Sequence, residues 1–284
     1  MKQCVITSAV RTAVGAYLGS LKDEEAQDLG AAVIREAAKR SQIGLDQIDQ
    51  VILGDVYGYT PNVARCAALI AGVPEEVPAY TVDRQCASSL QAVMSATYEI
   101  QAEEAEIVMA GGTESMSRML YYLDPSVRAH PLRMGDKPLF DAFTHGVTIV
   151  QPNKLYPNLN MGLTAENVAK RYHITREEQD AFAYDSQMKY KAAYEAGRFK
   201  DEIIPYEVKT RKGSFVFDTD EHPKLDCTME GLARLKPAFL RDGTGTVTAG
   251  NASGMNDGAS AVVVMPEEKA QVLGIQPLVR IVSS

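Results

Sequence analysis

The spacing of apolar residues changes across Cys86, and this change predicts a strand followed closely by a helix. Before the cysteine, Tyr80 and Val82 alternate as in a strand, and the β-branched Thr81 suits one. After it, residues recur at helical spacing, at Leu90, Val93, Met94 and Thr97. The sequence therefore places Cys86 at the junction between a strand and the first turn of a helix.

A thiol at the start of a helix meets backbone N–H groups and the positive end of the helix dipole, which favours its reactive thiolate form. The small neighbours Ala87, Ser88 and Ser89 leave room for a substrate to reach the sulfur. A strand–turn–helix junction also presents the nucleophile in other acyl-transfer enzymes. The alternative is a small, buried and inert thiol, the usual state of a free cysteine. The small neighbours favour a catalytic cysteine.

Strands and helices alternate before and after one long interruption. This alternation predicts a layered α/β domain whose mixed, mostly parallel five-stranded sheet is covered on both faces. The predicted strands are residues 4–10, 51–53, 80–82, 107–110 and 259–265, and the predicted helices are residues 26–40, 62–71 and the segment after Cys86.

We expect this interruption to form an inserted α+β domain at residues 119–248. Its first part, to about residue 160, lacks periodicity, and helices follow from Ala165 and from Thr175, where Thr175 and Glu178 form a capping box. Residues 201–248 read as extended segments and turns. We therefore expect one α/β domain at residues 1–118 and 249–273, and the start of a further domain at residues 274–284, where an apolar strand has no partner.

Composition excludes several classes of protein. The net charge of −8 argues against nucleic-acid binding. No apolar run approaches the roughly 18 residues of a membrane helix, and the apolar stretch at the N-terminus is too short for a signal peptide. Four cysteines stand far apart with no CxxC pair, which predicts reduced thiols in the cytoplasm and neither a metal site nor a disulfide framework.

Three further features each have two interpretations. Gly111 and Gly112 allow a close backbone approach or form a plain turn. His222 before Pro223 is a candidate base or part of a solvated turn. Six basic residues either face water or form a rim for an anionic phosphorylated cofactor; they are Lys209, Arg211, Lys212, Lys224, Arg234 and Lys236.

The glycine-rich segment 250–258 could bind a polar ligand chain through its N–H groups and Ser253. It lacks the lysine of a phosphate-binding loop, and residues 243–245 lack the third glycine of a dinucleotide fingerprint. Nucleotide hydrolysis and NAD binding are therefore excluded.

Blocks along nearly the whole chain together resemble the thiolases, which condense or cleave acyl-CoA thioesters. Each block alone is weak evidence, but the set is specific. The blocks are residues 9–15, 51–54, 84–92, 110–117, 161–167, 197–203, 235–239 and 246–258.

The resemblance implies that Cys86 is the nucleophile and that its N–H helps to stabilise a tetrahedral oxyanion. The inserted domain would cradle coenzyme A, which is a substrate and not a bound cofactor. Its implied contacts are Asn160, Met161, Lys224, Ala249, Ala252 and Ser253: the alanines and Ser253 along the pantetheine chain, and Lys224 near the nucleotide.

This sequence departs from the family pattern in two ways. Several short-chain thiolases carry a histidine where this chain has Asn160, which weakens an acetoacetyl-CoA assignment. The family also has a second half with a Gly-His-Pro histidine, an Asn-Glu-Ala-Phe asparagine and a second cysteine, and none of these motifs occurs here. We therefore expect little turnover by this chain alone, and a homo-oligomer or a separate chain that supplies those groups.

The implied activity is that of an acetyl-CoA C-acetyltransferase, which performs Claisen condensation or thiolysis through an acyl-cysteine in fatty acid metabolism. A degradative 3-ketoacyl-CoA thiolase for longer chains is one alternative. A non-catalytic CoA-binding or assembly subunit is the other.

Overall fold

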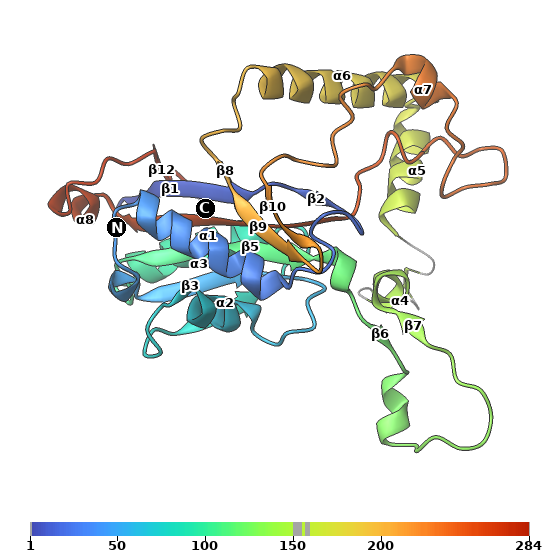
Figure 1. Ribbon diagram of the computed structural model, residues 1–284. Helices are drawn as coiled ribbons and strands as arrows, with labels where there is room; N and C mark the ends of the chain where they lie inside the picture. Colours follow the sequence, from blue (N-terminus) through green and yellow to red (C-terminus); the bar gives the residue numbers. More distant parts are fainter. Residues whose placement is uncertain (1, 150–154, 157–159, 284) are drawn as a thin grey trace. The chain divides into compact units, whose positions relative to one another are not determined.

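The computed structural model describes residues 2–149, 155–156 and 160–283. The chain divides into two compact units (Figure 1). The first unit comprises Met1–Arg118, Phe199–His222 and Met255–Ser284, and the second comprises Met119–Arg198 and Pro223–Gly254. Among the described residues, no helix is both long and apolar enough to cross a membrane.

The first unit is built on one mixed sheet with the strand order β12-β1-β11-β5-β3-β4. Strands β4 and β5 run parallel to β3, whereas β11 is antiparallel to both β1 and β5. The five predicted strands all form and lie next to one another as β1, β11, β5, β3 and β4, which confirms the α/β fold. The sheet of the described residues nevertheless has eight strands and not five, because β2, β8 and β12 also pair with it. The strands of this sheet are β1 (Cys4–Thr12), β2 (Gly15–Ala16), β3 (Gln50–Gly54), β4 (Ala79–Val82), β5 (Val108–Ser115), β8 (Ile203–Ile204), β11 (Asn256–Pro266) and β12 (Val279–Arg280).

Helices cover both faces of this sheet because successive strand residues point to opposite sides. In β3, Val51 and Leu53 enter the core cluster that contains residues of α1 and α2, whereas Ile52 enters a second cluster with residues of α3. The helices of this unit are α1 (Ala26–Arg40), α2 (Val63–Ala71), α3 (Ser88–Gln101) and α8 (Glu267–Val272), with 3₁₀ turns at Leu45–Gln47 and Met116–Arg118.

Both ends of α2 are capped. The side chain of Asn62 accepts a hydrogen bond of 3.3 Å from the N–H of Arg65 at the start of the helix. Gly72 ends the helix at φ 96°, a left-handed conformation that glycine adopts without steric cost.

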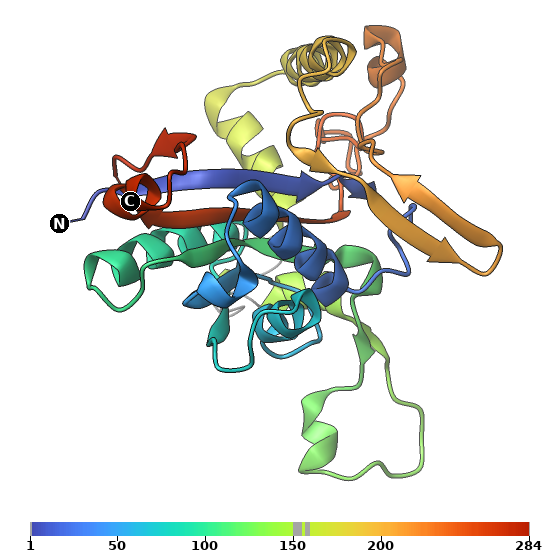
Figure 2. The same cartoon turned by 60° about the vertical axis from the view of Figure 1, so that its left-hand side comes forward.

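Residues 199–222 lie with the sheet, although the sequence analysis placed them in the insertion. Strand β8 pairs in parallel with β1, and β9 (Tyr206–Thr210) and β10 (Gly213–Phe217) form the antiparallel hairpin seen in Figure 2. Val208 and Phe217 are buried in the main core. Arg11 of β1 forms ion pairs near both ends of this segment, with Glu202 at 2.8 Å and with Asp220 at 2.7 Å. These non-local contacts are what joins the segment to the first unit.

The expectation of an unpaired strand near residue 280 is wrong. Val279 and Arg280 form β12, which adds antiparallel to β1 opposite Ile6 and Val5. The pairing still leaves apolar side chains in solvent, because Val279 is 55% exposed and Val282 is 90% exposed.

The second unit is mostly helical. Its capping box is confirmed: the Thr175 hydroxyl accepts from the N–H of Glu178, and the Glu178 carboxylate accepts from the N–H of Thr175. The helix predicted from Ala165 begins earlier, after Asn160, whose side chain caps it. The elements are β6 (Tyr121–Tyr122), a 3₁₀ turn (Pro125–Arg128), β7 (Phe140–Asp141), α4 (Ala142–Ile149), α5 (Met161–Tyr172), α6 (Arg176–Glu195) and α7 (Met229–Ala233), the last not predicted.

Candidate functional site

Cys86 lies on a sharp turn between β4 and α3. The preceding residue, Gln85, has φ 54°, a left-handed conformation that is uncommon for a residue with a side chain. The hydroxyl of Ser88 stabilises the turn, since it accepts a hydrogen bond of 2.9 Å from the N–H of Arg84 and donates one of 2.5 Å to the carbonyl of Gln85. This turn leaves Cys86 exposed, two residues before the first residue of α3.

Two glycines on neighbouring strands let the first turn of α3 approach the sheet. Gly54 of β3 pairs with Gly112 of β5. A Cβ on Gly54 would lie 2.6 Å from the backbone nitrogen of Ser89, and one on Gly112 would lie 2.0 Å from the Ser89 hydroxyl. Gly111 and Gly112 therefore serve a close approach within β5, and their interpretation as a plain turn is wrong.

The exposed thiol opens onto a cavity of about 390 Å³ in the first unit. This volume falls within the usual size of small-molecule sites. The cavity walls come from the turn at Cys86 and from the strands β1, β3, β5 and β11 with the residues next to them; among the lining residues are Arg11, Asp55, Glu114, Asn256 and Ser260.

The start of α3 is electrostatically positive. Its N-cap, Ala87, offers no side-chain acceptor to the first N–H groups, and the first turn contains no acidic residue. The helix dipole therefore favours negative charge at this end. Cys86 lies two residues before this end of the helix.

The other cysteines are less suited to react. Cys4 is buried, and burial raises the pKa of its thiol. Burial also raises the pKa of Cys227, with further contributions from Asp226 and Asp180. Cys66 is half-buried within α2. Cys86 is thus the most accessible thiol of the four.

Two carboxyl groups that the sequence analysis did not single out line the same cavity. Burial, followed by the charge of Asp55, raises the pKa of Glu114 to about 8. Burial likewise raises the pKa of Asp55. Shifted carboxyl groups in a cavity are a common mark of a functional site.

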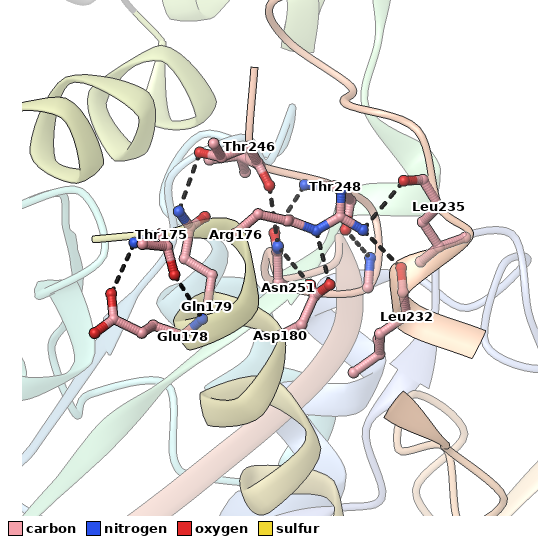
Figure 3. Close-up of polar contacts among 12 residues, drawn as sticks. Thr175, Arg176, Glu178, Gln179, Asp180, Leu232, Leu235, Thr246, Thr248 and Asn251 are labelled. Carbon is pink, nitrogen blue, oxygen red and sulfur yellow. Dashed lines mark hydrogen bonds and ion pairs between the residues drawn. The ribbon is translucent and has the colours of Figure 1, made fainter. Parts of the chain in front are cut away.

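In the second unit, two buried carboxylates hold the segment around Thr246 and Asn251. Glu166 of α5 accepts hydrogen bonds from the N–H groups of Thr246 and Val247 at 3.0 Å and 2.9 Å. Asp180 of α6 accepts from Asn251 at 2.9 Å and pairs with Arg176 at 2.7 Å (Figure 3). This polar network holds in place a segment that forms neither a helix nor a strand.

The residues that the resemblance assigned to coenzyme A all lie in the second unit, whereas Cys86 lies in the first. Ala249 and Ser253 are exposed and Ala252 is half-buried, in and after a turn that follows the segment held by Glu166. Met161 is exposed at the start of α5, beside its N-cap Asn160, whose side-chain oxygen accepts from the N–H of Leu163. Lys224 is exposed, and its backbone N–H donates to Gln187.

The predicted basic cluster does not belong to one unit. Lys209, Arg211 and Lys212 lie on the β9–β10 hairpin of the first unit, and the other three basic residues lie in the second. His222 is half-buried at the end of a first-unit segment and is not among the cavity-lining residues. In the described part of the chain, no group of three or more His, Cys, Asp or Glu side chains could hold a metal ion.

Comparisons with known proteins agree with one another. Residues 4–268 match the family described as the thiolase N-terminal domain. The acetyl-CoA acetyltransferase of Escherichia coli (strain K12) is 48% identical over 285 residues, covering 100% of this chain and 71% of that protein. The crystal structure of the Bacillus anthracis acetyl-CoA acetyltransferase superposes with a TM-score of 0.91 at 44% sequence identity. The crystal structure of human mitochondrial 3-ketoacyl-CoA thiolase superposes with a TM-score of 0.91 at 40% sequence identity. Each match covers 99% of this chain and 70% of the other chain.

Proposed function

The chain belongs to the thiolase family of acyl-CoA acyltransferases, and from this premise we propose that Cys86 carries the acyl group as a thioester. The observation that supports this assignment most strongly is the exposed thiol at the N-terminal end of α3, opening onto a cavity of about 390 Å³. The other three cysteines lack this combination of exposure and placement.

The proposed reaction has two steps. The Cys86 thiolate attacks the thioester carbonyl of an acyl-CoA, and the tetrahedral oxyanion collapses to acyl-cysteine while coenzyme A leaves as a thiolate and takes up a proton. A base then takes the α-proton of a second acyl-CoA, a role that the resemblance gives to the second cysteine of the family's other half. The resulting carbanion attacks the acyl-cysteine carbonyl and expels the Cys86 thiolate. Thiolysis of a 3-ketoacyl-CoA is the reverse sequence. Covalent catalysis thereby divides one difficult condensation into two easier steps.

The N–H of Cys86 is our proposed donor to the oxyanion. The field at the start of α3 supports this role, since the helix dipole favours negative charge there. A donor of this kind typically lowers the barrier by about 3–4 kcal/mol.

Coenzyme A is proposed to bind the second unit. Support comes from the Glu166 and Asp180 network, which holds residues 246–251 rigidly beside Ala252 and Ser253. Calorimetry with coenzyme A tests this site on Lys224→Ala and Ser253→Trp, with Lys189→Ala on the exposed part of α6 as the control. Weaker binding in the first two variants only is expected, and equal affinity in all variants would contradict the site.

We further propose that the protein acts in fatty acid metabolism in the cytoplasm as a homo-oligomer or with a partner chain. The four free thiols support a reducing compartment. The exposed Val279 and Val282 support a covering protein surface. A preference for longer acyl chains remains the second candidate, because Asn160 stands where several short-chain thiolases carry histidine.

Isotope exchange tests the first step alone. Labelled coenzyme A should be incorporated into unlabelled acetyl-CoA, since the acyl-cysteine forms and reverts without a second acyl-CoA. Cys86→Ala should abolish the exchange, and Cys66→Ala should preserve it. Exchange that survives Cys86→Ala would overturn the assignment.

A further inference from the structure

Asp55 and Glu114 come together because the parallel strands β3 and β5 lie side by side. Gly54, the last residue of β3, pairs with Gly112 of β5, so Asp55 follows one strand end and Glu114 lies two residues beyond the other glycine. Asp55 is only 8% exposed. Its Oδ1 atom is buried and has no hydrogen-bond partner among the described residues.

A tight turn wraps around both carboxyl groups. The two oxygens of Glu114 accept hydrogen bonds from the N–H groups of Val56 at 2.9 Å and Tyr57 at 3.1 Å. Gly58 lies so close that a Cβ there would be 1.8 Å from Oδ2 of Asp55. The carboxyl groups are themselves within hydrogen-bonding reach of each other. They therefore form one packed unit and not two independent charges.

Among the described residues that line the cavity, no basic side chain is free to neutralise two negative charges. Arg11 is the one basic side chain among the described residues that line the cavity. Its guanidinium group already pairs with Asp220 and Glu202. Two adjacent buried carboxylates without a cation cannot both stay ionised near neutral pH, and one proton bound between them removes the repulsion. The raised pKa values of both groups agree with this geometry.

We propose that Asp55 and Glu114 hold one proton between them at the wall of the Cys86 cavity, and that this pair controls the reactivity of Cys86. With the proton in place, the wall carries one negative charge. When the proton leaves to water, a second negative charge appears and disfavours the Cys86 thiolate. The two carboxyl groups act on the Cys86 thiol through their charge and do not contact the reacting atoms. Asp55 and Glu114 are therefore positioning residues and not catalytic residues.

The charged and titratable groups around the pair are few. Tyr57 lies within electrostatic range of Glu114, Cys86 and Asp83, which places the pair and the thiol in one electrostatic neighbourhood. Asp83 precedes the Cys86 turn and also acts on Asp55. From β11, Asp257 lines the cavity, and from β1, Arg11 does so. Burial raises the pKa of the Asp257 carboxyl group.

The first test titrates the pair directly. Carbon-13 NMR of the glutamate carboxyl groups, with Glu114 assigned by its loss in Glu114→Gln, should show Glu114 releasing its proton near pH 8. Asp55→Asn should shift that titration to lower pH, because the like charge is removed. A Glu114 that titrates near the ordinary value of about 4.3 in the unsubstituted protein would overturn the proposal.

The second test reads the consequence at the thiol. The rate of Cys86 alkylation by iodoacetamide is measured from pH 6 to 9.5 in the unsubstituted chain, in Glu114→Gln, and in Glu104→Gln as a control at the far end of α3. Above pH 8 the rates of the unsubstituted chain and the control should fall below a one-proton curve, whereas Glu114→Gln should follow such a curve and react several-fold faster at pH 9. Identical one-proton curves in all three would overturn the proposal. This experiment needs no acyl transfer, so its failure is distinct from failure of the proposed function.

Discussion

The side-chain amide of Asn251 donates a hydrogen bond of 2.9 Å to the carboxylate of Asp180, which is 3% exposed on α6. Asn251 also accepts from the N–H of Thr248 at 2.7 Å. The Asp180 carboxylate thus orients the side chain of Asn251, which in turn holds the loop backbone at Thr248. The order of the 246–251 segment therefore depends on Asp180.

Asp180→Ala should lower the free energy of unfolding by about 1–3 kcal/mol, because Arg176 and Asn251 lose a buried partner. Asp185→Ala is the matched control, since it removes an exposed ion pair with Lys189 from the same helix and should cost at most about 1 kcal/mol. Urea denaturation of the two variants measures the difference. Equal losses would show that the network contributes nothing beyond a surface charge.

Gly54→Ala should disturb the Cys86 turn. The added methyl group would lie 2.6 Å from the backbone nitrogen of Ser89, so α3 must shift away from the sheet. Overpacking of this kind typically costs about 1–3 kcal/mol. Gly258→Ala on β11 is the control, because the nearest atom to its new methyl group is the Thr12 hydroxyl oxygen at 3.3 Å. Thermal unfolding and the alkylation rate of Cys86 should both change more for Gly54→Ala, and the reverse order would contradict the packing argument.

The stability of the protein should fall as the pH rises from about 4.5 to about 8. Burial and the charge of Asp55 raise the pKa of Glu114 to about 8 in the folded state, against about 4.3 for an ordinary glutamate. Within that window the folded protein keeps a proton that the unfolded chain has released, so higher pH favours unfolding. Below the window the contribution of Glu114 is complete.

Urea denaturation at several pH values checks this dependence. Glu114→Gln should flatten the decline in unfolding free energy, while the exposed Glu104→Gln should leave it unchanged. A decline of equal slope in both variants would mean that another group is responsible.

Local structure could be predicted where residues close together in the sequence determine it. Helix α1 has the predicted bounds, Ala26–Arg40, because its apolar residues follow the helical period. The capping box at Thr175 could likewise be predicted from neighbouring residues. The strand-to-helix change around Cys86 belongs to the same class.

Features that depend on distant pairing were not predictable. Asp55 and Glu114 are 59 positions apart, and only the parallel pairing of β3 with β5 brings them together. The sequence signal was that each acid follows, within one or two residues, a glycine that comes soon after a predicted strand. The hairpin β9–β10 was assigned to the insertion because nothing local to residues 199–222 reveals that β8 pairs with β1 or that Arg11 binds Asp220. The roles of Lys224, Ser253 and their neighbours stay predictions.

Peptide mapping by mass spectrometry after brief incubation with acetyl-CoA and acid quenching tests the central claim most directly. The thiol of Cys86 is exposed at the start of α3, whereas Cys4 is buried and the pKa of Cys227 is raised. We expect the acetyl group on the peptide that contains Cys86, and its loss in Cys86→Ala but not in Cys227→Ala. An acetyl group found first on another cysteine, or retained in Cys86→Ala, would contradict the account.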